Sequence, residues 1–99
     1  MQVKFATVAE GELDDAILYY EAAVEGLGTR FRNEVERVAI QLGRMPMLWP
    51  EVWPTIRRCL LSRFPYALIY AIEADYVLVL AVAHQHRKPG YWQDRIAEP

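Results

Sequence analysis

Cysteine, lysine and long apolar runs are scarce in this chain of 99 residues. Its single cysteine, Cys59, allows no intramolecular disulfide and no cysteine cluster for a metal, and we expect it to be a small buried residue. The longest apolar run, residues 76–83, has the length of a strand, whereas a membrane span needs about 20 apolar residues. The N-terminus also lacks the features of a signal peptide, so the sequence predicts a cytoplasmic protein that does not cross a membrane.

Motifs of the common cofactor and metal sites are absent as well. The chain has no glycine-rich phosphate loop, no HExxH, no CxxC and no serine nucleophile elbow. His84 and His86 are close in sequence, but no cysteine or nearby acidic pair completes the three or four ligands that a stable metal site usually needs. We therefore predict no metal and no cofactor.

Length and composition predict one small domain, residues 1–99, that binds a partner. A domain of this size buries only about 60–65% of the surface that its unfolded chain exposes. Hydrophobic residues make up 54% of the sequence, slightly more than is usual for a globular protein. Some of that apolar surface is expected to stay outside the core, where a partner protein can cover it.

Charge is distributed unevenly along the chain. Residues 1–56 hold five basic and nine acidic side chains, whereas residues 57–95 hold six basic and three acidic ones. Both histidines lie in this second part. Such an asymmetry is typical of a surface that faces an anionic partner.

The first half of the chain predicts a strand and a helical hairpin. Residues 2–8 alternate as in a short strand. Thr7 and Glu10 have the spacing of a capping box, and a helical apolar stripe then runs to Gly26 and Gly28. We expect Thr29 to cap a second amphipathic helix, which Pro46 ends.

The second half predicts a connector followed by three strands. Residues 45–54 contain three prolines and are expected to form a rigid, extended connector. Strand-like runs follow at residues 55–61, 66–72 and 76–84, and the last two are apolar on both faces. The predicted fold class is α+β, ordered β-α-α-β-β-β, with the helical hairpin packed on a mostly antiparallel four-stranded sheet. The other face of the sheet needs cover from the C-terminal segment or from another protein.

This order and a series of short motifs resemble the RelE/ParE toxin superfamily, and more closely its ParE-like, plasmid-stabilisation members. The motifs are Tyr19-Tyr20-Glu21, Gly26-Leu27-Gly28, Phe31, Glu34-Val35, Pro46, Pro50, Arg57-Arg58, Phe64-Pro65-Tyr66, Tyr70, Val79-Leu80-Ala81-Val82, His84, His86-Arg87, Pro89, Tyr91-Trp92 and Arg95. The resemblance implies a toxin of a type II toxin–antitoxin system, which inhibits growth until a cognate antitoxin binds it, and a heterotetramer is one assembly that the two can form. It further implies one of two targets, DNA gyrase or the mRNA on the ribosome, or a degenerate member that only binds its antitoxin.

An mRNA endonuclease would need cationic and acid–base side chains near its substrate. Arg57 and Arg63 are expected to share a strand face and can position a phosphate, or they can simply cover the sheet. His84 and His86 are also expected to share a face, in line with Leu80 and Val82. Histidine suits proton transfer near neutral pH, although a histidine that orders the C-terminal turn is the commoner case.

Tyr91 and Trp92 can stack on a base or plug the second face of the sheet, and we favour packing because large aromatics are mostly packing groups. Catalytic candidates of a nuclease are thus His84, His86, Arg57, Arg63 and Tyr91. Under either mechanism we expect a target-binding surface formed by Arg57, Arg63, His84, His86, Arg87, Lys88, Tyr91, Trp92 and Arg95.

Two departures weigh against the nuclease. The net charge is −2, whereas proteins that bind ribosomal RNA are usually strongly basic. The only lysines are Lys4 and Lys88, and the predicted second helix has none, although RelE-type nucleases tend to be lysine-rich there. We therefore favour a non-enzymatic, gyrase-inhibiting toxin over an mRNA endonuclease.

Overall fold

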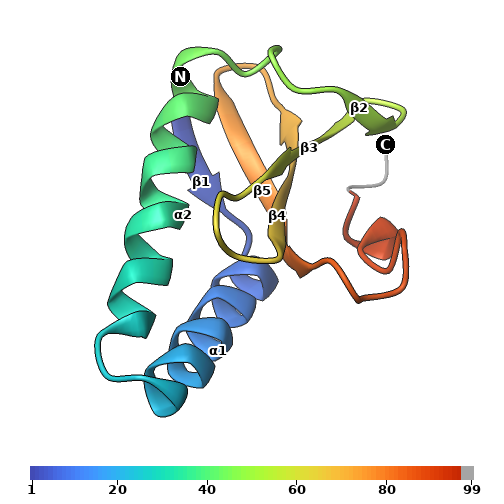
Figure 1. Cartoon of the computed structure of the whole chain (residues 1–99). Helices are drawn as coiled ribbons and strands as arrows, with labels where there is room; N and C mark the ends of the chain where they lie inside the picture. Colours follow the sequence, from blue (N-terminus) through green and yellow to red (C-terminus); the bar gives the residue numbers. More distant parts are fainter. Residues whose placement is uncertain (97–99) are drawn as a thin grey trace.

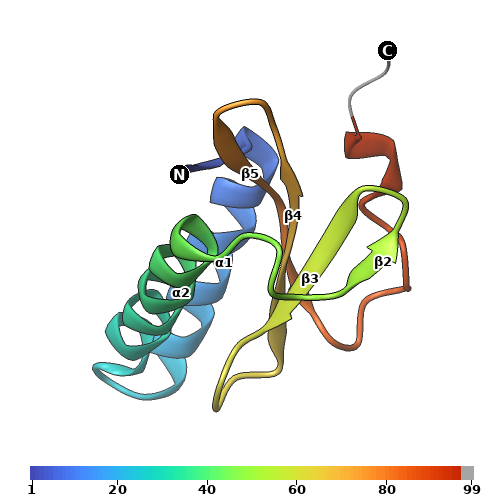
Figure 2. The same ribbon diagram turned by 90° about the horizontal axis from the view of Figure 1, so that it is seen from above.

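The computed structural model describes residues 1–96 of the chain. Its elements are β1 (Gln2–Phe5), α1 (Thr7–Ala23), α2 (Leu27–Arg44), β2 (Glu51–Trp53), β3 (Ile56–Leu60), β4 (Tyr66–Ile72), β5 (Tyr76–His84) and the short 3-10 helix η1 (Gln93–Arg95). The two helices lie on one side of the sheet, and the C-terminal segment lies on the other (Figure 1, Figure 2). The α+β class and the packing of a helical hairpin on the sheet are confirmed.

The sheet has five strands in the order β1-β5-β4-β3-β2 within residues 1–96. β1 runs parallel to β5, and the other neighbours are antiparallel. Four strands were predicted, and β2 is the additional one. It is only three residues long and all three are exposed, so it carries no alternation of buried and exposed residues from which a strand could be predicted.

The helix starts differ from the prediction. α1 begins at Thr7 after Ala6, which makes no side-chain cap, so the expected capping box is absent and the first strand stops at Phe5. α2 begins before Thr29. Its first amides are capped by the preceding helix, because the Glu21 carboxylate accepts hydrogen bonds from the backbone N–H groups of residues 26 and 28 at 2.9 and 3.0 Å.

Gly28 lets the two helices approach closely at this corner. A Cβ atom on Gly28 would lie 2.6 Å from the carbonyl oxygen of Ile17. Gly26, two residues earlier, has a φ of 85°, which glycine adopts at little cost. The two glycines thus set the tight turn of the hairpin.

The larger core fills the space between the helices and the sheet. Phe31, Val35 and Leu42 of α2 pack with Tyr70 and Val79 of the central strands, and all five are almost completely buried. Burial of each such side chain stabilises the fold by about 1.5–3 kcal/mol. This layer is what holds the hairpin on the sheet.

A smaller core lies on the opposite face of the sheet. Trp92 of the C-terminal segment is 6% exposed and packs with residues of β3, β4 and β5, among them Ile56, Ile69 and Leu80. The packing role favoured for Trp92 is confirmed, and Tyr91 lies against the same cluster. No helix in the described part of the chain is long and apolar enough to cross a membrane.

Candidate functional site: a cationic cleft on the second face of the sheet

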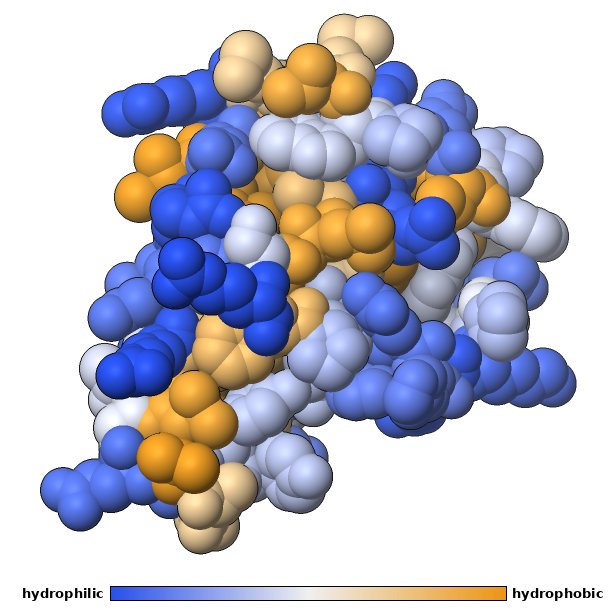
Figure 3. All heavy atoms as spheres, viewed as in Figure 1, coloured by the Kyte–Doolittle hydropathy of each residue, from blue (hydrophilic) through white to orange (hydrophobic). Residues whose placement is uncertain are grey.

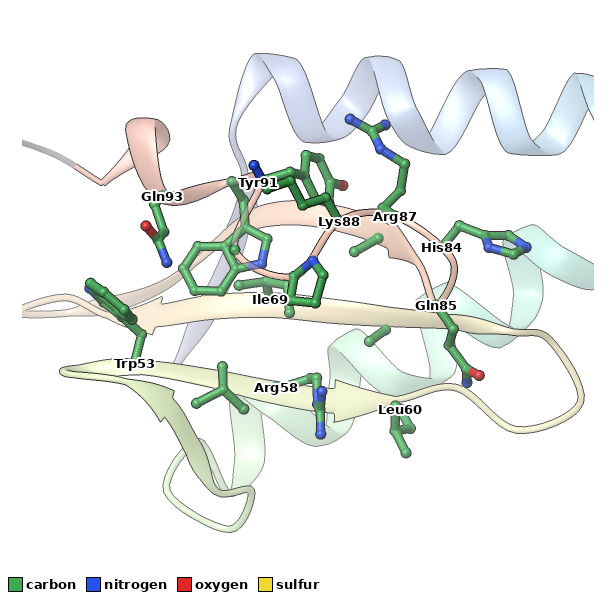
Figure 4. Close-up of a pocket in the computed structure, with 16 residues that line it drawn as sticks. Trp53, Arg58, Leu60, Ile69, His84, Gln85, Arg87, Lys88, Tyr91 and Gln93 are labelled. Carbon is green, nitrogen blue, oxygen red and sulfur yellow. The ribbon is translucent and has the colours of Figure 1, made fainter.

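A cleft of about 670 Å³ opens between β2, β3 and the C-terminal segment. Figure 4 shows Arg58 and Leu60 on β3 along one wall, with Lys88 and Tyr91 across the cleft. The rim also carries the exposed apolar side chains of Val52, Trp53 and Leu60, which are 37%, 46% and 55% exposed. The cleft therefore combines apolar surface with positive charge.

Arg58 is the cation that β3 presents to this cleft. Strand alternation puts Arg58 on the face of Ile56 and Leu60, opposite Cys59. Its exposed side chain forms no ion pair or hydrogen bond with residues 1–96. A guanidinium in this state can donate to an anionic partner without first breaking a contact.

Arg57, by contrast, lies on the helix side and acts as a structural brace. Its Nη1 donates to the carbonyl oxygens of Trp49 at 2.6 Å and Met47 at 3.1 Å. Glu51 lies 4.0 Å from the same guanidinium. Arg57 thus ties the connector to β3, and its guanidinium already has partners within the chain. The two neighbouring arginines therefore differ in role, and Arg58, which was not among the predicted site residues, is the one free to bind a target.

Alternation predicted that Arg63 shares a strand face with Arg57, and this prediction was wrong. β3 ends at Leu60, and Arg63 lies in the following loop with a φ of 70°. There it lines a second, more open groove of about 960 Å³ together with Arg30 and Arg37 of α2. Alternation holds only inside a strand, so a prediction extended past its end fails.

His84 is engaged at the end of β5. The backbone N–H of His86 donates to His84 Nδ1 at 3.0 Å, and the His84 ring packs against Tyr66 at a centroid distance of 4.9 Å. In Figure 4 the ring points away from Arg58. The two histidine rings lie 4.8 Å apart, and His84, but not His86, is among the residues that line the cleft.

His84 was predicted to lie in line with Leu80, but it does not, because a β-bulge lies between them. The pairing of β4 with β5 shifts by one residue between Ile69 and Tyr70, opposite Leu80. Leu80 therefore faces the smaller core, whereas Val82 faces the helices. One inserted residue reverses the alternation for the rest of the strand.

Glu12 of α1 organises the C-terminal segment. Its carboxylate accepts hydrogen bonds from the Val82 backbone N–H at 3.0 Å and the Tyr91 hydroxyl at 2.7 Å. It also forms a two-point ion pair with Arg95, at 2.8 and 3.1 Å. Arg95 in turn donates to the carbonyl of Leu80 at the bulge. This network fastens the segment to the part of β5 that β1 leaves uncovered.

Glu12 was not predicted to be important, because no local signal distinguishes it from the other acidic residues early in α1. Glu10, Asp14 and Asp15 share its helix and its charge, but they are exposed. Only the fold brings Glu12 to within hydrogen-bond distance of residues about 80 positions away.

Tyr91 and Arg95, both expected to bind a target, are held in this network. Burial, assisted by the hydrogen bond to Glu12, raises the pKa of Tyr91 to about 12. The phenol therefore stays protonated at neutral pH and is a poor base. Burial likewise raises the pKa of Cys59 to about 11, so this thiol is not an activated nucleophile.

Arg87 and Lys88 lie in the exposed loop between β5 and Tyr91. The Arg87 guanidinium sits over the Tyr91 ring, 3.9 Å from its centroid. Figure 4 shows Arg87 and Lys88 across the cleft from Arg58. Positive charge thus extends from inside the cleft over its rim. Within residues 1–96 no cluster of His, Cys, Asp or Glu is arranged to hold a metal ion.

Comparison with known proteins agrees with this architecture. The model of the ParE toxin of the type II toxin–antitoxin system parDE matches residues 3–89. A solved structure described as the chromosomal ParDE TA system from P. aeruginosa shares the fold, with a TM-score of 0.62, 18% identity, and coverage of 85% of this chain and 95% of that chain. No curated protein matches the chain significantly. Because the family model spans most of the sequence, the chain belongs to the ParE toxin family of type II toxin–antitoxin systems.

Proposed function

We propose that this chain inhibits bacterial growth by binding DNA gyrase through the cationic cleft, and that it does not cut RNA. The observation that carries the proposal is the contrast between two sets of side chains. Arg58 and Lys88 are exposed and carry positive charge without a partner among residues 1–96. Arg57, His84 and Tyr91, three of the side chains suited to acid–base or phosphate chemistry, are instead bound within the protein.

Three of the five nuclease candidates have a structural role. Arg57 braces the connector, Tyr91 donates to Glu12, and His84 accepts from the turn that follows it. Among these candidates only His86 and Arg63 are exposed, and neither lines the cleft, since Arg63 lies in the groove beside α2. A general acid and a general base must both reach the substrate, and this geometry favours a binding surface over a catalytic one.

A cognate antitoxin completes the proposal. The rim residues Val52, Trp53 and Leu60 leave apolar surface uncovered beside cations, which suits an acidic, amphipathic segment of an antitoxin. A stable complex of this kind should bury more than about 1,000 Å² in total. Occupation of the cleft would keep the toxin from its target.

Two assays with the purified toxin test the target. Supercoiling of relaxed plasmid by gyrase should be inhibited as toxin is added, and the co-encoded antitoxin should restore it. Message should stay intact on ribosomes programmed with mRNA and incubated with the same toxin. Site-specific cleavage of the message, with gyrase unaffected, would overturn the proposal and identify an mRNA endonuclease.

A further inference from the structure

Tyr91 connects the partly buried Glu12 carboxylate of α1 to Arg87 at the cationic rim of the cleft. Glu12 Oε2 accepts from the Tyr91 hydroxyl at 2.7 Å. The ring of Tyr91 then carries the Arg87 guanidinium on its face, 3.9 Å from the ring centroid. Arg95 holds the other side of the same carboxylate and also lies 5.0 Å from the Tyr91 ring. The Tyr91 ring is thus fixed at its hydroxyl end and by a second cation.

Arg87 has little else to define its direction. It lies in an exposed turn after β5, and its guanidinium makes no ion pair with the described residues. An arginine in that situation loses much rotamer freedom when it binds an anion, and that loss weakens binding. An aromatic ring beneath the guanidinium restricts the side chain in advance, provided that the ring itself cannot turn.

We propose that Glu12 is a positioning residue of the target-binding surface: through the Tyr91 hydroxyl it fixes the ring on which Arg87 is presented. The inference rests on the proposed function, because it takes Arg87 to contact the target. Glu12 itself, 18% exposed at its side chain and saturated by three donors from the chain, does not touch the target.

Two substitutions of Tyr91 separate the hydroxyl from the ring. Tyr91→Phe keeps the ring but removes its bond to Glu12, whereas Tyr91→Leu removes the surface on which Arg87 lies. Glu12→Gln tests the carboxylate directly, and Asp15→Asn is the matched control, since it removes one negative charge from an exposed position on the same helix. If Glu12→Gln does not fold, Tyr91→Phe carries the test alone.

The first measurement is the NMR shift of the Arg87 δ-methylene protons, which ring currents move upfield when they lie over the face of Tyr91. We expect the upfield shift in the parent protein and in Asp15→Asn. It should shrink in Glu12→Gln and Tyr91→Phe and vanish in Tyr91→Leu. An unchanged Arg87 shift in both Glu12→Gln and Tyr91→Phe would show that Glu12 does not position Arg87.

The second measurement is a double-mutant cycle on growth inhibition, scored as the amount of folded toxin needed to halve the growth rate. Glu12→Gln or Tyr91→Phe should raise that amount about three- to tenfold in the parent background. Neither should raise it further when Arg87→Ala is already present, because the effect passes through Arg87. Fully additive losses would refute positioning. Growth inhibition can be measured whatever the target is. If the substitutions are coupled to Arg87→Ala but the toxin does not inhibit gyrase, only the proposed target is refuted.

Discussion

The two faces of the sheet are closed in different ways. Two full helices cover one face, and their apolar stripe buries a continuous core around Phe31 and Tyr70. The other face is covered by the segment after β5, whose Trp92 fills only part of it. The uncovered remainder is the cleft with Arg58 on its wall. Stability is concentrated on the first face, and the surface available for partners on the second.

The surface reflects the same division. In Figure 3 strongly hydrophilic side chains gather over α2, and the apolar atoms appear in separate groups between them. The outer side of α2 carries exposed charges of both signs, including Arg32, Glu36 and Arg37. Such a mixed surface is well solvated and selects no particular partner. In the cleft, by contrast, the charges on β3 and on the loop after β5 are positive.

The largest expected effect belongs to the helix-covered face. Phe31→Ala should lower the free energy of unfolding by about 3–5 kcal/mol, because it leaves a cavity among fully buried neighbours. Leu60→Ala, at a rim position that is 55% exposed, is the control and should change stability far less. Denaturant unfolding followed by circular dichroism measures both. Equal losses in the two variants would show that the faces do not differ in this way.

A neighbouring pair of arginines gives the next contrast. Arg57→Ala should lower the free energy of unfolding by about 1–3 kcal/mol, because the carbonyl groups of Met47 and Trp49 lose their donor. Arg58→Ala should stay within about 0.5 kcal/mol of the parent, yet relieve growth inhibition. Thermal unfolding and a growth assay on the same variants separate the two outcomes. A toxic Arg58→Ala variant would remove Arg58 from the proposed binding surface.

The smallest effect is expected in alkali. Burial raises the pKa of Tyr70, on the helix side, and of Tyr91, on the second face, to about 12 in each case. Between pH 10 and about 12 the unfolded chain therefore loses phenolic protons that the folded chain keeps, and stability should fall as the pH rises. A tyrosinate absorbance titration should show tyrosines that ionise only near pH 12, and Tyr91→Phe should remove one of them. If it removes none, Tyr91 is not held as described.

Much of the fold could be predicted from the sequence because periodicity persists over long elements. The runs at residues 66–72 and 76–84 correspond to β4 and β5 without a shift at either end, and both helices were anticipated. Prediction failed where a contact between distant residues decides the outcome. Glu21 caps α2 in place of Thr29, and the short edge strand β2 is held only by its pairing with β3.

The candidate site was predicted in outline but not in its details. A cationic C-terminal half was evident from charge alone, and the plug formed by Trp92 followed from the apolar strands. Arg57 was predicted to bind the target in place of Arg58. The sequence could not show which of the two is available, because alternation indicates which residues share a strand face but not which face the helices cover. Glu12 could not be found at all, since its partners lie about 80 residues away.

The central claim is that the toxin acts through the second face. Its most direct test is growth inhibition by the double variant Arg58→Ala/Arg87→Ala, compared with Arg30→Ala/Arg32→Ala, which removes two exposed arginines from α2. Circular dichroism should first show that both variants are folded. The cleft variant should then allow growth, because two charge-assisted contacts are lost, while the helix variant arrests growth as the parent does. Full toxicity of the folded cleft variant, or loss of toxicity in the helix variant alone, would contradict the account.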